Sequence, residues 1–119
     1  MTATESLLPV FDLADALERV DGDRAFLQQL IQVFFASSAD SLARIHQAID
    51  SNNGEHLAEA AHSLKGALGN LSALRSHDYA KALELAGKNN DFESARATAP
   101  RLEESLYHFY SKAQQELGF

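Results

Sequence analysis

Apolar residues recur along most of the chain at the three- and four-residue spacing of amphipathic helices, and alternating β-branched runs are missing. The longest stripe lies in residues 24–51, and Ser38 is its one polar position. Its apolar members are Leu27, Ile31, Phe34, Leu42, Ile45 and Ile49, widened at the start by Phe26, Leu30 and Phe35. This pattern predicts an all-α fold with one long helix over these residues.

The same spacing predicts four other helices. A short one follows Asp12, which can cap it, and runs to about Val20. The second covers about residues 55–71. The third begins between Ser72 and Ser76 and runs to Gly87, and the fourth covers residues 92–117. Pro100 lies inside the last segment and should kink it or split off a short piece, because proline removes a backbone donor.

Short polar turns separate the predicted helices at residues 21–23, 51–54 and 88–91, and an aspartate of the first turn can cap the helix after it. Four long helices with short connections favour an antiparallel up-and-down four-helix bundle. The short extra N-terminal helix would then cover it. We expect residues 1–10 to be an N-terminal lead-in and residues 11–119 to be the helical bundle domain.

Composition narrows the possible functions. The 119 residues carry a formal charge of −7, which disfavours binding to nucleic acid or to an anionic membrane. Because there is no cysteine, thiol catalysis and thiolate metal sites are excluded. The pair of inward-facing Glu-x-x-His motifs of a di-iron bundle is also missing, so we expect no metal site. The N-terminal residues do not resemble a signal peptide, and we expect a cytoplasmic protein.

His62 is the first candidate for chemistry. With 100° per residue, and with the centre of its helix's apolar stripe at zero, Lys65 lies at roughly 80°, Gly69 at about 120°, His62 at about 140° and Gly66 at about 180°. All four therefore point away from the bundle. Each glycine in a helix interior costs about 0.5–1 kcal/mol relative to alanine. The close approach of another protein's surface to this face would explain why glycine is present. Imidazole is a nucleophile near neutral pH, and Lys65 could neutralise a phosphoryl group on it. Periodicity alone still leaves an ordinary surface histidine as an alternative.

The segment Ala61-His62-Ser63-Leu64-Lys65-Gly66, followed by Gly69-Asn70-Leu71, closely resembles the signature of histidine-containing phosphotransfer (HPt) domains. Gly22-Asp23, Phe34-Phe35 and Leu83-Glu84 resemble the family's flanking pattern, so the likeness covers most of residues 12–117. It implies that His62 is the phosphoacceptor, Lys65 the phosphate-side cation and Gly66 a steric gap. One departure is Ser72, where the family usually has glycine. We expect Ser72 instead to cap the helix that follows it.

The resemblance implies a function in a phosphorelay. His62 would accept a phosphoryl group from the aspartate of a receiver domain and pass it to another receiver, of a response regulator or a hybrid sensor kinase. Mg²⁺ would belong to the receiver, so the chain needs no cofactor. No nucleotide-binding motif is present, and we expect a monomeric phosphocarrier rather than a kinase.

Three alternatives remain from the sequence. One is an HPt-like interaction module that binds without transferring phosphate, although it would not need both His62 and Lys65. A second is the dimerisation helix pair of a sensor kinase, but Ser63 stands where such kinases carry an acidic residue. The third is the N-terminal phosphoacceptor domain of a chemotaxis kinase, which has a very similar histidine segment.

Overall fold

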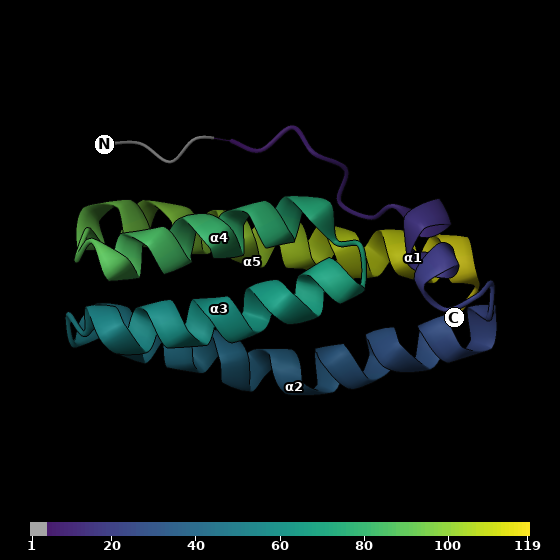
Figure 1. Cartoon of the computed structure of the whole chain (residues 1–119), viewed down its shortest axis with the longest axis horizontal. Coiled ribbons are helices and arrows are strands. Elements are labelled where there is room, and N and C mark those ends of the chain that lie inside the picture. Colours follow the sequence, from purple (N-terminus) through teal and green to yellow (C-terminus); the bar gives the residue numbers. More distant parts are fainter. Residues whose placement is uncertain (1–4) are drawn as a thin grey trace.

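The computed structural model describes residues 5–119, which form five helices and contain no strand (Figure 1). In chain order the helices are α1 (Leu13–Arg19), α2 (Arg24–Asp50), α3 (Gly54–Asn70), α4 (Leu74–Lys88) and α5 (Phe92–Leu117). The all-α prediction is confirmed, and the helices begin and end close to the predicted residues. No helix within residues 5–119 is both long and apolar enough to cross a membrane.

Polar caps determine where most of the helices begin. The side chains of Asp12, Asp23, Asn53 and Asp91 each accept a hydrogen bond from a backbone N–H in the first turn of the helix that follows. These bonds satisfy donors that a helix start otherwise leaves without a partner. The predicted caps at Asp12 and in the turn at residues 21–23 are therefore confirmed.

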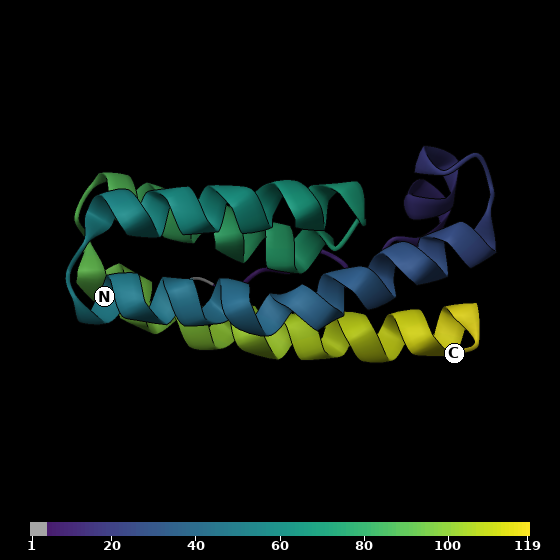
Figure 2. The ribbon, with the colours of Figure 1, turned by 90° about the horizontal axis from the view of Figure 1, so that it is seen from below.

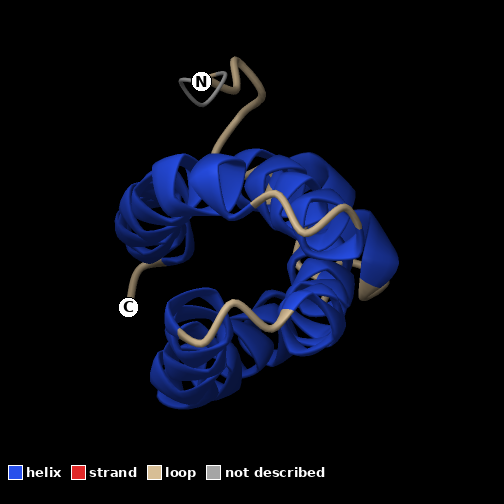
Figure 3. Ribbon diagram, turned by 90° about the vertical axis from the view of Figure 1, so that its left-hand side faces the viewer, coloured by secondary structure: helices blue, strands red, loops and turns tan. Residues whose placement is uncertain are grey.

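The long helices alternate in direction along the chain (Figure 1). Contacts join α2 to α3, α3 to α4, α4 to α5, and α5 back to α2. Figure 3, a view along the long axis, shows the helices around the core that their apolar stripes fill. The helices α2 and α5 extend beyond α3 and α4 at one end, and α1 lies beside that end (Figure 2).

The apolar stripes predicted from the sequence form the core, with one exception. Leu27, Ile31 and Phe34 of α2 are buried together with Phe109 of α5. Phe26, predicted to widen the stripe of α2, is 47% exposed, so that prediction is wrong. It lies in the first turn of α2, at the end where α2 extends beyond α3 and α4 (Figure 1).

Of the two outcomes predicted for Pro100, a kink or a split of the helix, the split does not occur. Helix α5 runs without interruption from Phe92 to Leu117, with Pro100 inside it. On both sides of this proline the inward residues Ala95, Ala99, Leu102 and Leu106 are buried. Packing against α2 and α4 therefore keeps the segment helical despite the missing backbone donor.

The turn between α3 and α4 corrects the prediction for Ser72. The N-cap of α4 is Ala73, and it makes no side-chain cap. Ser72 instead adopts a left-handed conformation with a φ of 56°, and its buried hydroxyl donates to Asp15 Oδ2 in α1 at 2.6 Å. The Ser72 carbonyl also accepts from the backbone N–H of Asp12 at 3.0 Å. The turn thus has the conformation that glycine favours, while the serine hydroxyl holds α1 in place and lowers the pKa of Asp15.

Residues 5–10 of the predicted lead-in lie along α4. The backbone N–H of Ser6 donates to the Tyr79 hydroxyl at 2.8 Å, and the Arg75 side chain donates to the Leu8 carbonyl at 2.8 Å. Glu5 lies 3.7 Å from Arg101 of α5. Residues 1–4 of that predicted lead-in lie outside the described residues.

Helices α3 and α4 make a close backbone contact at Gly54 and Gly87. A Cβ atom built on Gly87 would lie 2.6 Å from the Ala58 nitrogen and 2.7 Å from the Gly54 carbonyl oxygen. A Cβ atom on Gly54 would overlap the Gly87 carbonyl oxygen. All the obstructing atoms at Gly87 belong to the backbone, so this position has no room for a side chain unless the helices separate. At Gly54 the side chain of Asn90 obstructs as well.

We predict that Gly87→Ala destabilises the protein by about 1–3 kcal/mol, because the added methyl group forces α3 and α4 apart. Urea unfolding followed by circular dichroism measures the change. The control is Gly66→Ala, where a Cβ would meet nothing within 4 Å and helix propensity should stabilise the protein by about 0.5–1 kcal/mol. Equal midpoints for Gly87→Ala and wild type would contradict the close contact.

Candidate functional site

His62 lies on the outer side of α3, and its side chain is 67% exposed. The neighbouring residues Ala61 and Leu64 are buried and anchor the helix in the core. The imidazole is therefore held on a rigid element while most of its surface faces solvent.

Glu84 of α4 holds one edge of the His62 ring. Its Oε2 atom lies 2.9 Å from His62 Nδ1, while its Oε1 atom accepts a hydrogen bond from Lys65 Nζ at 2.6 Å. The Glu84 side chain is only 10% exposed, so these partners replace most of its water. One carboxylate therefore joins the two residues of α3 that the sequence singled out.

Lys88, one turn after Glu84 on α4, adds a second lysine. Its Nζ atom lies 3.5 Å from Glu84 Oε2, and its side chain is 62% exposed. Lys65 is more enclosed, with 25% of its side chain exposed. The site thus contains one ionised carboxylate between two lysines and a histidine.

The lysines keep Glu84 ionised. The hydrogen bond from Lys65 is the main cause that lowers the pKa of Glu84 to about 2, with smaller contributions from His62 and Lys88, and burial opposes the change. An ionised carboxylate can only accept hydrogen bonds. His62 must therefore carry its proton on Nδ1, and in the neutral ring the lone pair of Nε2 is then free to act as a nucleophile.

The two predicted glycines have different surroundings. A Cβ atom on Gly66 would meet nothing within 4 Å, so this position is open to the outside. A Cβ atom on Gly69 would lie 3.4 Å from the ring of His77 on α4. Gly66 therefore leaves free surface beside His62, whereas Gly69 faces a neighbouring helix.

Sequence reasoning missed the part that Glu84 and Lys88 take in the site. A signal for Glu84 was present, because it shares the inward face of α4 with Ala80, Leu83 and Gly87. A charged residue in a buried stripe requires partners, and the outward Lys65 of α3 was available. Lys88 follows at the i+4 position, a common spacing for an ion pair on a helix.

The other histidines do not gather into a metal site. His46 pairs with Glu103 across α2 and α5, and His108 lies 3.7 Å from Glu104 on the same helix. Within residues 5–119 no three histidine or acidic side chains come together in a way that could hold a metal ion.

We predict that Glu84→Gln removes an acid-sensitive part of the stability. Because the pKa of Glu84 falls from 4.5 to about 2 on folding, the ionised group stabilises the protein above about pH 4.5, and this contribution is lost as the pH falls through about 2. The stability advantage of wild type over Glu84→Gln should shrink by at most about 3 kcal/mol between pH 6 and pH 2.

Urea unfolding at a series of pH values measures this difference. The matched control is Glu104→Gln on the exposed face of α5, for which the difference from wild type should stay small at every pH. A Glu84→Gln variant whose unfolding free energy runs parallel to that of wild type would show that the lysines do not hold an ionised Glu84.

Comparison with known proteins identifies the family. The model of the Hpt domain family matches residues 29–111. The crystal structure of histidine-containing phosphotransfer protein B (HptB) from Pseudomonas aeruginosa PAO1 is similar in fold, with a TM-score of 0.75 at 24% sequence identity over 92% of this chain and 96% of that one. No curated protein matches the chain significantly. Because the family model matches well over half of the chain, the protein belongs to the Hpt domain family and is a histidine phosphotransfer protein of two-component phosphorelays.

Proposed function

We propose that His62 is the phosphoacceptor, and that it takes a phosphoryl group from the aspartate of one receiver domain and passes it to another. The observation that carries this proposal is the hydrogen bond between His62 Nδ1 and the ionised Glu84. It leaves Nε2 as the free nucleophile on a ring that is mostly exposed. Hpt proteins interact with receiver domains in two-component systems, which supplies the partner class.

In the proposed transfer, Nε2 attacks the phosphorus atom of the receiver's aspartyl phosphate. The P–N bond forms, the P–O bond to the aspartate breaks, and the aspartate leaves as a carboxylate. The proton stays on Nδ1, so the phosphorylated ring carries a positive charge that the Glu84 carboxylate stabilises. Transfer to the next receiver reverses these steps.

Lys65 is the proposed phosphate-side cation. Before transfer its ammonium group is bound to Glu84, and Lys65 follows His62 by three positions on α3, so the two side chains are neighbours on the helix surface. A phosphoryl group on His62 would compete with Glu84 for this lysine. Glu84 would still keep Lys88 as a partner, which limits the cost of releasing Lys65.

The catalytic Mg²⁺ is proposed to belong to the receiver, and the chain to need no cofactor of its own. We propose a monomeric phosphocarrier without ATP-dependent kinase activity, located in the cytoplasm. We also propose that α2–α5 are an antiparallel up-and-down four-helix bundle within a domain at residues 11–119, with α1 as its cover. The contact of α5 with α2 supports this arrangement.

The proposal predicts that His62→Gln accepts no acid-labile phosphate, because no other side chain replaces Nε2. The protein is incubated with a radiolabelled, phosphorylated receiver domain, and transfer is followed on gels. His108→Gln, which changes an exposed histidine of α5, is the control and should accept phosphate at the wild-type rate. Acid-labile phosphate on His62→Gln would refute the assignment, and no transfer to wild type would favour a binding-only module.

Gly66→Ala should slow transfer from the receiver by about tenfold, although the same change is expected to stabilise the fold. The added methyl group occupies surface that a docked receiver needs, and loss of about 1.4 kcal/mol of docking energy corresponds to this factor. Labelling of His62 by phosphoramidate, a small phosphodonor, should be unaffected. Equal slowing with both donors would indicate a damaged site rather than hindered docking.

A further inference from the structure

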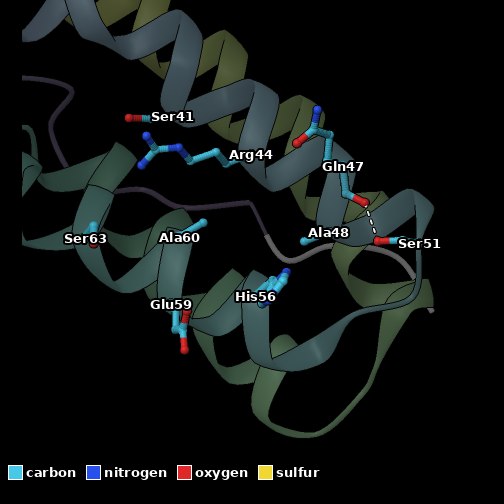
Figure 4. Close-up of a pocket in the computed structure, with 9 residues that line it drawn as sticks. All are labelled: Ser41, Arg44, Gln47, Ala48, Ser51, His56, Glu59, Ala60 and Ser63. Atoms are coloured by element: carbon cyan, nitrogen blue, oxygen red, sulfur yellow. Dashed lines mark hydrogen bonds between the residues drawn. The ribbon is translucent and has the colours of Figure 1, made fainter.

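A polar groove lies between α2 and α3 (Figure 4). Its volume is about 510 Å³. Ala48 and Ala60 are small residues on the two helices that line it, so no large side chain fills the space between them. Ser41, Arg44 and Ser63 are among the polar residues of its lining. The groove is therefore hydrophilic and lies where two helices already pack.

The groove continues the surface around His62. Glu59 lies three residues before His62, so the two are neighbours on the surface of α3. Ser63, also in the lining, is the residue that follows His62 in the chain. Both residues are exposed. A protein domain that docks over His62 can therefore also contact this edge of the groove.

Arg44 gives the groove its chemical preference. Within residues 5–119 the Arg44 side chain has neither a hydrogen bond nor an ion pair, although the chain carries 17 acidic residues against 10 basic ones. Figure 4 shows Arg44 extending from α2 along the groove and His56 pointing from α3 toward α2, while Glu59 points away. A guanidinium group with serine hydroxyls beside it is suited to bind a carboxylate.

We propose that this groove receives an acidic side chain of the receiver domain that docks at His62, and that Arg44 is a specificity-determining contact. The inference rests on the proposed function, because it takes the docked partner to be the phosphodonor. The groove's lining residues Arg44, His56, Glu59 and Ser63 are all exposed, which favours a protruding group of a protein over an enclosed small molecule. A receiver with a basic residue at the matching position would be rejected by repulsion.

The test uses the full chain and the receiver domain that transfers fastest to it among those of the host. Arg44→Glu should raise the KM for the phosphorylated receiver by about fivefold or more at low salt, with kcat nearly unchanged, and the effect should decrease as salt increases. Arg44→Lys should be close to wild type. Lys112→Glu makes the same change of charge on α5, at the opposite end of the molecule (Figure 1), and should leave KM unchanged.

Two further measurements separate the possible outcomes. Phosphoramidate should label Arg44→Glu and wild type equally, which shows that the variant is folded and that His62 is intact. A scan of the receiver's exposed acidic residues, each changed to lysine, should yield one variant that restores transfer to Arg44→Glu.

An unchanged KM for Arg44→Glu, or a KM raised equally by Lys112→Glu, would overturn the inference while leaving the proposed function in place. A second result would also overturn it: citrate raises the Tm of wild type but not of Arg44→Glu, and the KM of Arg44→Glu equals that of wild type. The groove would then bind small anions and not the receiver. Absence of transfer from any receiver to wild type would overturn both.

Discussion

The backbone contact between α3 and α4 at Gly87 sets the positions of His62 and Glu84 relative to each other. The backbone of Ala58 passes so close to Gly87 that a methyl group would not fit between them. His62 lies four residues after Ala58, and Glu84 lies three residues before Gly87. Because the two helices run in opposite directions (Figure 1), one helical turn along each brings both side chains to the same level. The distance of 2.9 Å between His62 Nδ1 and Glu84 Oε2 follows from this register.

The register also determines the electrostatics of the site. A largely buried carboxylate needs charged partners, and removing a partner is costly when the charge stays behind. Glu84 has three partners, from both helices, and therefore remains ionised. The same ionisation sets the tautomer of His62 and so selects the nitrogen that faces solvent. A single interhelical contact thus orients the proposed nucleophile and keeps a lysine beside it.

The sequence predicted the helices well because their stripes and caps are local. Asp12 and Asp23 stand next to the residues that they cap, and the stripe of α3 can be followed from Leu57 to Leu71 without reference to other helices. The exposed position of His62 follows from the same periodicity. These features need only the geometry of one helix.

The features that the sequence did not predict depend on contacts between helices. Glu84 belongs to the site only because α4 packs against α3 in one register, which no single-helix pattern contains. The hydrogen bonds of Ser72 join it to Asp15 of α1 and to Asp12, the N-cap of that helix, more than 50 positions earlier in the chain. Pro100 remains inside a helix because residues on both of its sides are buried against other helices. In each case tertiary packing outweighs the local preference.

Glycine in a helix has two distinct explanations in this protein. Gly87 is required from inside, because backbone atoms of α3 occupy the space of its missing side chain. Gly66 has no such reason, since a methyl group there would meet nothing within 4 Å. Its cost of about 0.5–1 kcal/mol in helix propensity is not offset by any contact within the described chain. We propose that a constraint from outside the molecule accounts for it. Gly66 lies one turn after His62, where the proposed phosphoryl donor would approach closely.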